Sequence, residues 1–418
     1  MKPGQPSPRV LILTAGFGEG HNAAARALAA GFSDVSRSTT NAALARESSV
    51  KIADAFALAS PRFNDVSRRF YLTLINRAPR LWSRVYDWID RSELVQRRMW
   101  LFRREIRMLA QLLEQERPTA ICCTYPLYGF FLAEISRAGG YVAPTFNIVT
   151  DSISIHSLWW KAPLSGWFMP NEDSAAVMRA AGIAPESIHI CGFPVPAFFA
   201  EHASVLSPPD LATGVSPRVL HIINSGTRHA EETARRLLLE TPWEITCAVG
   251  RDSGLITRLS RLASNRRHPT QILGWTDQIP RLLMTHHAVV SKAGGATTQE
   301  AIAALCPMVV SQVVPGQEEG NYELLRRHKA GAFAPTPEAV LAALSRAFAN
   351  RGRVWREWRA ALRPLALPDA AGDIARHVLA KVAEREAYPA QPDILPTSGD
   401  VTAHPARPPA LYENPLHP

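Results

Sequence analysis

Two glycine-rich turns contain the residue types that could do chemistry in this chain. One reads AGFGEGH at 15–21 and the other SKAGGAT at 291–297, and each follows a short apolar run. Glycine lets the backbone approach a ligand closely, and the N-terminus of a following helix favours negative charge. The second turn therefore predicts a diphosphate site built from backbone N–H groups. It is not a Walker A motif, because no GKS or GKT follows the glycines.

The first turn does not fit the dinucleotide-binding fingerprint. That motif needs its third glycine one place later than Gly20, and an acidic residue about 20 positions further on. The acid after the second predicted strand, Asp54, lies nearly twice as far away. His21 enters the following helix on the ligand side, where it could contact hydroxyl groups or act as a base. The alternative is a helix-terminal histidine that only bonds the backbone.

Polar residues beyond the second turn favour a sugar nucleotide. Glu300 follows one helical turn later and could accept both hydroxyls of a ribose. A glutamate at this point is also favoured by the helix dipole alone. The next predicted strand ends in PGQEEGN at 315–321, whose amide and carboxylate side chains suit hexose hydroxyls. Both loops end parallel strands, so we expect them to face one cleft.

The elements that must position these turns alternate between apolar strands and helices. The expected strands are 10–14, 50–53, 121–124, 146–150, 219–223, 245–249, 271–273, 288–291 and 308–311. The expected helices are 21–32, 230–239, 255–263, 278–285, 298–304 and 322–328. Continuous apolar strands separated by helices are typical of buried parallel sheets, so the pattern predicts a doubly wound α/β architecture in each half.

Length and composition agree with two such domains and an anionic partner. Hydrophobic residues fill 46% of 418 positions, and the formal net charge is +9. The five cysteines are odd in number and match no zinc or redox spacing, which favours free thiols in a reducing compartment. We see neither a secretory signal nor an apolar run long enough to span a bilayer. We therefore expect a cytoplasmic protein that lies on a membrane at most.

A basic aromatic stretch suggests where a membrane would be contacted. Residues 62–107 hold 12 Arg and five acids, a surplus of seven positive charges, together with eight Trp, Tyr and Phe. Basic residues interleaved with aromatic ones suit an interfacial segment on anionic lipid. The alternative is a set of solvated helices with their aromatic rings in the core. No nucleic-acid motif is present, so nucleic acid is not expected as a partner. The oligomeric state is left open.

Four segments carry a resemblance to a known family. They are GFGEGHNAAA at 16–25, TDSISIHSLW at 150–159, SKAGGATTQEA at 291–301 and PGQEEGN at 315–321, and Asn171 and GFPV at 192–195 agree as well. On these motifs the chain resembles the monogalactosyldiacylglycerol synthases and the bacterial processive diacylglycerol glucosyltransferases over roughly residues 9–385. More distantly it is similar to the peptidoglycan N-acetylglucosaminyltransferase that acts on a lipid-linked intermediate.

The resemblance implies a GT-B fold, with two Rossmann-like doubly wound domains facing a cleft. The enzyme would invert the anomeric carbon and use a UDP-sugar as substrate, with no cofactor and no metal. The expected parts are an acceptor and membrane-binding domain at 1–206, a linker at 207–217, and a UDP-sugar-binding domain at 218–368. A helix at 369–387 would pack back on the first domain, and 388–418 would be a disordered tail.

The resemblance also assigns site residues. His21 and Asp151 are the candidate bases, and Gly18, Gly20, His156 and Trp159 would lie near the acceptor. Packing roles for His156 and Trp159, and a structural capping role for Asp151, are the alternatives. The donor site would be formed by Ser225, Gly226, Thr227, Trp275, Thr276, Lys292, Gly294, Gly295, Thr297, Glu300, Gln317, Glu318 and Asn321. One departure is the turn at 224–227, which has a single glycine where the family is glycine-rich, so hydroxyls would replace N–H groups there.

The predicted function is transfer of galactose or glucose from a UDP-sugar to a lipid, with diacylglycerol as the expected acceptor. The enzyme would lie on the inner face of the membrane. Three alternatives remain open. They are a UDP-N-acetylglucosamine-dependent transferase with another lipid-linked acceptor, a soluble GT-B sugar-nucleotide epimerase, and an inactive membrane-binding protein that keeps the nucleotide site.

Overall fold

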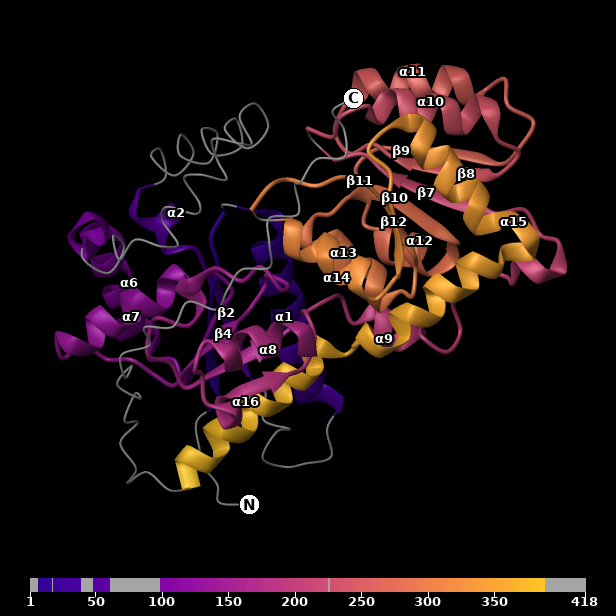
Figure 1. Cartoon of the computed structure of the whole chain (residues 1–418). Helices are drawn as coiled ribbons and strands as arrows, with labels where there is room; N and C mark the ends of the chain where they lie inside the picture. Colours follow the sequence, from indigo (N-terminus) through magenta and orange to yellow (C-terminus); the bar gives the residue numbers. More distant parts are fainter. Residues whose placement is uncertain are drawn as a thin grey trace.

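Two parallel six-stranded sheets form the two halves of the protein, and helices cover both (Figure 1). The computed structural model describes residues 7–16, 18–38, 48–60, 98–224, 226–316 and 318–387. The first sheet contains β1 (Arg9–Leu13), β2 (Ser49–Ala53), β3 (Ala120–Cys123), β4 (Thr145–Ile148), β5 (Gly166–Met169) and β6 (Ile188–Ile190). The second contains β7 (Arg218–Ile222), β8 (Glu244–Ala248), β9 (Thr270–Leu273), β10 (Ala288–Lys292), β11 (Met308–Gln312) and β12 (Gly331–Phe333).

The order of strands fixes where ligands can enter. The first sheet runs β2-β1-β3-β4-β5-β6 and the second β12-β11-β10-β7-β8-β9, with parallel pairing throughout. Successive strands are added toward one edge of each sheet and then toward the other, and the change of side falls between β1 and β3 in the first sheet and between β7 and β10 in the second. At such a switch point the loops beyond the strand carboxyl ends diverge and leave a crevice. Both glycine-rich turns follow a strand at a switch point, so the topology brings them to the edges where ligands bind.

The helices connect the strands on both faces of the sheets. In the first half they are α1 (Glu19–Ser38), α2 (Ala55–Ala59), α6 (Arg103–Glu116), α7 (Leu127–Arg137), α8 (Glu172–Ala180) and α9 (Phe198–His202). In the second they are α10 (Ala230–Glu240), α11 (Ser253–Ala263), α12 (Ile279–Thr285), α13 (Gly295–Ala303), α14 (Glu319–Arg327), α15 (Pro337–Leu362) and α16 (Ala370–Ala387). Short 3₁₀ turns include η1 (Met99–Phe102) and η2 (Ser157–Trp159).

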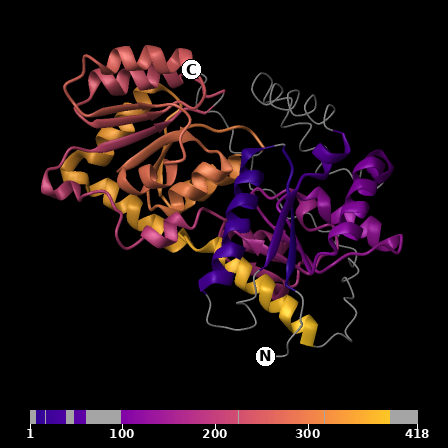
Figure 2. The same cartoon turned by 180° about the vertical axis from the view of Figure 1, so that it is seen from behind.

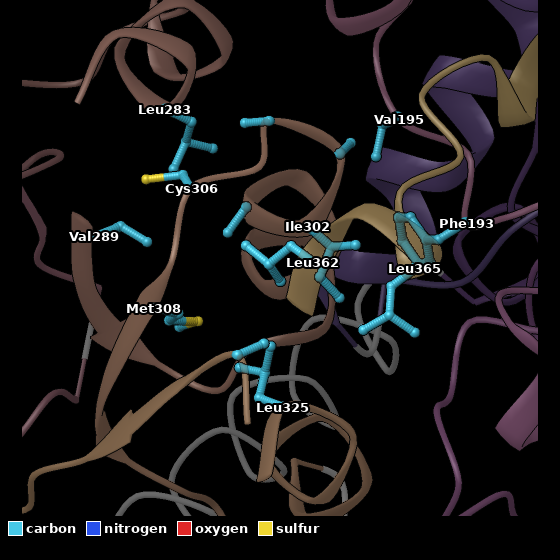
Figure 3. Close-up of a cluster of buried hydrophobic side chains, with 14 of the residues drawn as sticks. Phe193, Val195, Leu283, Val289, Ile302, Cys306, Met308, Leu325, Leu362 and Leu365 are labelled. Atoms are coloured by element: carbon cyan, nitrogen blue, oxygen red, sulfur yellow. The ribbon is translucent and has the colours of Figure 1, made fainter. Parts of the chain in front are cut away.

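One apolar cluster is shared by the two halves. Phe193 and Val195, which follow β6, pack in the same buried cluster as Ile302 of α13 (Figure 3). Leu362, the last residue of the long helix α15, and Leu365 just beyond it complete this contact from the C-terminal side. Each Å² of apolar surface buried between the two halves contributes about 25 cal/mol, and this free energy stabilises one relative placement of the halves. The shared cluster therefore holds the two sheets at a defined distance across the cleft.

The last helix returns to the first half of the chain. Figure 2 shows α16, in yellow, alongside α1, in indigo. The two helices approach so closely that a Cβ on Gly31 would lie 2.7 Å from the backbone of Ala371. Ile374, Val378 and Leu379 join the buried cluster beneath α1 and β1. The chain thus crosses the domain boundary twice, once after β6 and once before α16.

Several expectations can be compared with this architecture. The two doubly wound parallel sheets are confirmed. Residues 62–97 of the basic aromatic stretch and the tail at 388–418 lie outside the described residues. Among the helices of the described segments, none combines the length and the apolar character needed to cross a membrane. All five cysteines are unpaired, and four of them are buried.

Candidate active site

Asp54 holds the first glycine turn in place. Its Oδ2 accepts the Gly16 N–H at 2.9 Å, and its Oδ1 accepts the N–H groups of Phe56 and Ala57 at the start of α2. The acid that argued against a dinucleotide site therefore has a structural role. It ties the β1 turn to the β2 turn, and so fixes the entry of α1 and the position of His21.

The bonds of His21 define its protonation state. Its Nδ1 lies 2.7 Å from the Thr124 carbonyl oxygen and 2.9 Å from Thr150 Oγ1. A carbonyl can only accept, so Nδ1 carries the proton and Nε2 keeps its lone pair. Burial lowers the pKa of His21 to about 4, against the opposing effect of the Thr124 bond. His21 is therefore a neutral ring with Nε2 as an acceptor at physiological pH.

Asp151, the other candidate base, lies at the end of β4. Its Oδ2 accepts the Trp159 indole N–H at 2.7 Å. Burial raises the pKa of Asp151 to about 6, although this bond and the backbone N–H of His156 favour the carboxylate. A carboxyl group with this pKa is ionised at pH 7 yet remains a usable base. Trp159 also packs near the His21 ring, with ring centroids 6.5 Å apart.

Trp159 and His156, which the sequence assigned to the acceptor site, are both buried and have partners within the chain. Trp159 is fully buried, and its carbonyl oxygen accepts the Asn147 amide and the Trp167 indole N–H. His156 is also buried and caps η2 through its ring nitrogen. Neither side chain faces open solvent, and each makes a hydrogen bond within the chain. Trp159 instead orients Asp151, which sequence reasoning could not separate from a channel role because an aromatic side chain fits both.

The two glycine turns face each other across the cleft. A Cβ on Gly20 would lie 3.9 Å from the Ala296 backbone nitrogen, and one on Gly295 would lie 3.9 Å from the Thr150 carbonyl oxygen. The start of α13 thus approaches both the start of α1 and the loop that carries Asp151. The first-turn N–H groups of a helix have no partner within the helix, so those of α13 can receive an anion. Gly294, Gly295 and Thr297 all lie at this helix start.

Glu300 projects from α13 into a largely desolvated place. Burial raises the pKa of Glu300 to about 7, and the nearby charge of Arg26 on α1 opposes this rise only partly. A carboxylate held there strengthens any hydrogen bond from a ribose hydroxyl, because the local dielectric is low. The resulting carboxyl group titrates near neutrality, so ligand affinity through Glu300 should depend on pH.

The predicted sugar-binding residues surround the second turn. Glu318 forms an ion pair with Lys292, with 2.5 Å between Nζ and Oε1, and its Oε2 accepts the Val314 N–H. Asn321 donates its amide to the Ala293 carbonyl oxygen, while its Oδ1 is buried and lacks a partner within the described chain. A buried acceptor without a donor is costly unless a ligand satisfies it. Gln317 lies outside the described residues.

The loop after β7 has a positioning residue that the sequence did not reveal. Gln312 at the end of β11 accepts the Arg228 N–H at 2.8 Å and donates to the Gly226 carbonyl oxygen at 3.5 Å. Gly226 has φ +79°, which a glycine adopts freely. Thr227 Oγ1 is buried without a partner in the described chain, as a hydroxyl reserved for a ligand would be. Ser225 lies outside the described residues.

Trp275 and Thr276 stand apart from the phosphate turn. The Trp275 side chain is 70% exposed, which leaves its ring free to cover a base. Thr276 Oγ1 accepts the Gln278 N–H just before α12, so this hydroxyl has a structural partner. The structure therefore supports a contact role for Trp275 more directly than one for Thr276.

Comparison with known proteins agrees with this architecture. The model of the monogalactosyldiacylglycerol (MGDG) synthase family matches residues 21–195. The processive diacylglycerol β-glucosyltransferase of Bacillus subtilis (strain 168) is 23% identical over 358 residues, covering 83% of this chain and 89% of that protein. The protein of the same description from Bacillus mycoides (strain KBAB4) is 22% identical over 404 residues, covering 95% and 98%.

Solved structures show the same fold. Acinetobacter baumannii MurG has a TM-score of 0.55 at 14% identity, covering 89% of this chain and 99% of its own. The UDP-GlcNAc 2-epimerase of Neisseria meningitidis, bound to UDP-GlcNAc, has a TM-score of 0.54 at 12% identity, covering 89% and 100%. These matches place the chain in the GT-B fold class. Within that class it is similar to the MGDG synthase family and to the processive diacylglycerol glucosyltransferases, which confirms the resemblance found in its motifs.

The first prediction concerns the pH dependence of UDP binding. Ribose hydroxyls would donate to the ionised form of Glu300, and the pKa of the free group is about 7, so UDP affinity should be full above pH 8. Below pH 7 it should fall by up to about tenfold per pH unit, as a single required deprotonation implies. The measurement is calorimetric titration with UDP from pH 5.5 to 8.5.

Glu300→Gln supplies the control, because the phosphate of UDP also titrates in this range. The variant should bind UDP more weakly at pH 8 and should show only the residual slope that belongs to the phosphate. Equal slopes in both proteins would remove Glu300 from the nucleotide site.

Proposed function

We propose that the protein transfers a hexose from a UDP-sugar to a lipid hydroxyl, with diacylglycerol as the acceptor and inversion at the anomeric carbon. The single observation that carries this proposal is the meeting of two unlike groups across the cleft. The N-terminus of α13, which suits a diphosphate, lies within contact distance of the loop that carries Asp151. A phosphate site beside a buried base is what a displacement at a sugar–phosphate bond requires.

Asp151 is the proposed base. Its pKa of about 6 lies near the working pH, whereas the pKa of His21 lies near 4. Asp151 would take the proton of the acceptor hydroxyl as that oxygen bonds to the anomeric carbon. The bond from that carbon to the β-phosphate oxygen breaks, and UDP leaves with its electron pair. The neutral His21 is the alternative base, because its Nε2 has a free lone pair that could accept the same proton.

The N–H groups at the start of α13 would stabilise the charge on the departing diphosphate. They are preorganised by the helix and need not reorient during reaction. Glu300 would hold the ribose, and Trp275 would cover the uracil. Asn321 Oδ1 is a buried acceptor without a partner in the described chain, and it would receive a sugar hydroxyl.

Membrane contact is proposed through the described end of the basic stretch. Trp100 and Leu101 in η1 are 57% and 53% exposed. Exposed arginines flank them on both sides of this short turn, at Arg98, Arg103, Arg104 and Arg107. Large apolar side chains beside cations suit the boundary between lipid headgroups and acyl chains. This surface belongs to the same half as His21, and binding there would bring the acceptor site to the inner membrane face.

One alternative has a specific observation behind it. The fold is shared with a UDP-GlcNAc 2-epimerase bound to its nucleotide sugar. An epimerase would act on the sugar nucleotide alone and would need no lipid. The product of the reaction separates the two functions.

The second prediction is the product itself. Incubation with diacylglycerol vesicles and UDP-glucose or UDP-galactose should yield UDP and a glycosylated diacylglycerol by lipid mass spectrometry, and UDP-N-acetylglucosamine is the third donor to test. The Asp151→Asn protein serves as the inactive control. Absence of any glycolipid would refute diacylglycerol as acceptor, and a new UDP-sugar epimer without lipid would favour the epimerase.

The third prediction follows from the carboxyl group of Asp151. Only its ionised form can accept a proton, so kcat measured at saturating UDP-sugar should fall about tenfold per unit below pH 6. Asp151→Asn should lower kcat by about 10²–10⁴ while UDP affinity changes little. A rate that stays level down to pH 5 and declines only near pH 4 would assign the base role to His21 instead.

The fourth prediction concerns the exposed pair in η1. Trp100→Ser with Leu101→Ser should reduce binding to anionic vesicles at least about tenfold, because two apolar side chains no longer insert. Val205→Ser with Leu239→Ser is the matched control, since both of these side chains are apolar and well exposed elsewhere. Co-sedimentation of both variants measures the difference. Equal loss in the two proteins would show that general surface polarity, not this site, sets the affinity.

A further inference from the structure

The ion pair between Lys292 and Glu318 joins the two loops of the donor site. Lys292 ends β10 and Glu318 immediately precedes α14, so the contact spans two strand–helix connections. The ammonium lies 2.5 Å from Oε1, and the Val314 N–H occupies Oε2 at 3.0 Å. The Glu318 side chain is only 8% exposed, so little of it is open to a sugar in this state.

The pair also borders the diphosphate turn directly. A Cβ on Gly294 would lie 3.8 Å from Glu318 Oε1 and 3.8 Å from Lys292 Cε. Any phosphate seated on the start of α13 would therefore come close to the ammonium. The Lys292 side chain is 25% exposed, and its four-carbon stem is flexible, so the ammonium has a path away from Glu318.

We propose that Lys292 exchanges Glu318 for the diphosphate when the UDP-sugar binds, and that this exchange releases Oε1 to accept a sugar hydroxyl. The inference rests on the proposed function and adds an order of assembly to it. The sugar-binding carboxylate is made available by the phosphate that carries the sugar. A diphosphate bears more negative charge than one carboxylate, so it is the stronger partner for the ammonium.

The exchange has a different consequence for the product UDP. Once Lys292 turns to the diphosphate, the buried carboxylate of Glu318 loses its cation, and a buried charge without a partner is costly. Sugar hydroxyls compensate this loss in the UDP-sugar complex, but UDP alone offers none. The ion pair therefore weakens UDP relative to UDP-sugar, which favours release of UDP after transfer.

The test is the affinity of UDP for Glu318→Gln. Glutamine has nearly the same shape but does not compete for the ammonium, so UDP should bind about three- to tenfold more tightly than to the wild type. Sugar transfer should fall at least tenfold, because an amide accepts sugar hydroxyls less strongly than a carboxylate. A merely structural role for Glu318 would weaken both UDP binding and transfer. Unchanged or weaker UDP binding by a folded Glu318→Gln protein would overturn the proposal.

Glu319→Gln is the matched control, since it removes the same charge one residue away, in the first turn of α14. We expect it to change UDP affinity less than twofold. An equal gain in both variants would show a general electrostatic effect and would also overturn the exchange. UDP that fails to bind the wild type would instead refute the proposed function, so the two failures are distinguishable.

A second measurement uses the wild-type protein and does not depend on how the variant folds. The chain has six lysines, so reductive ¹³C-methylation gives few signals, and Lys292→Arg identifies the relevant one. Saturating UDP should shift the Lys292 signal while that of Lys161, on the other half, stays in place. A Lys292 signal that UDP does not move would overturn the exchange.

Discussion

The close approach of α14 to the loop after β4 sets the geometry of the whole site. A Cβ on Gly320 would lie 1.7 Å from the Ser152 carbonyl oxygen, so only glycine permits this contact. The amide of Gln299 on α13 also donates to Ser152 Oγ at 2.9 Å. Two helices of the second half therefore rest on one loop of the first half. Asp151 is the preceding residue of that loop, and its distance from the donor turn follows from this packing.

Desolvation at this junction explains the unusual acidities of the site. Burial lowers the pKa of His21 and raises the pKa values of Asp151 and Glu300, so in each case the neutral form is favoured. The consequence differs with the chemistry of each group. The histidine becomes a neutral acceptor, while the two carboxyl groups acquire pKa values within reach of neutrality. One physical cause thus underlies both the base proposed at Asp151 and the pH-dependent nucleotide contact proposed at Glu300.

The two halves also make polar contacts between α8 and the C-terminal end of α14. Asp173 on α8 accepts His328 Nε2 at 2.8 Å and lies 3.6 Å from the Arg327 guanidinium. These partly exposed polar contacts contribute little to stability on their own. Together with the apolar cluster around Phe193 and Ile302, they define one orientation of the halves. The site needs that orientation because its two chemistries come from different sheets.

Much of the fold could be predicted because strands and turns are local signals. The runs around β1, β7 and β10 are largely apolar, and each ends close to its predicted place. Other elements gave weaker signals. β5 (GWFM) begins with glycine, β12 has only three residues, and α15 contains a break at 349–352 that no proline marks. A long irregular helix of this kind is fixed by the surface it covers and not by its own sequence.

In the candidate site as well, contacts between residues close in sequence could be predicted and contacts between distant residues could not. The motif spacing placed Gly294, Glu300 and Asn321 near one turn, because they lie within two consecutive strand–helix units. Contacts between residues far apart in the sequence could not be predicted from it. Gln312 reaches a loop more than 80 residues earlier, and Trp159 turns inward to Asp151 although its sequence allows a channel role equally well.

The ion pair of Lys292 and Glu318 shows why such distant contacts change function and not only shape. Both residues fit the family motif as separate donor contacts, and motif matching alone would give each its own ligand atom. The structure instead makes them partners of one another, so neither can bind a ligand independently of the other. A site whose charges are already paired must exchange partners to bind, and its affinity then depends on how many of those charges the ligand satisfies. A UDP-sugar can satisfy both residues at once, while UDP can satisfy only one. The difference between substrate and product thus lies in the internal pairing of the site as much as in the contacts made by the sugar.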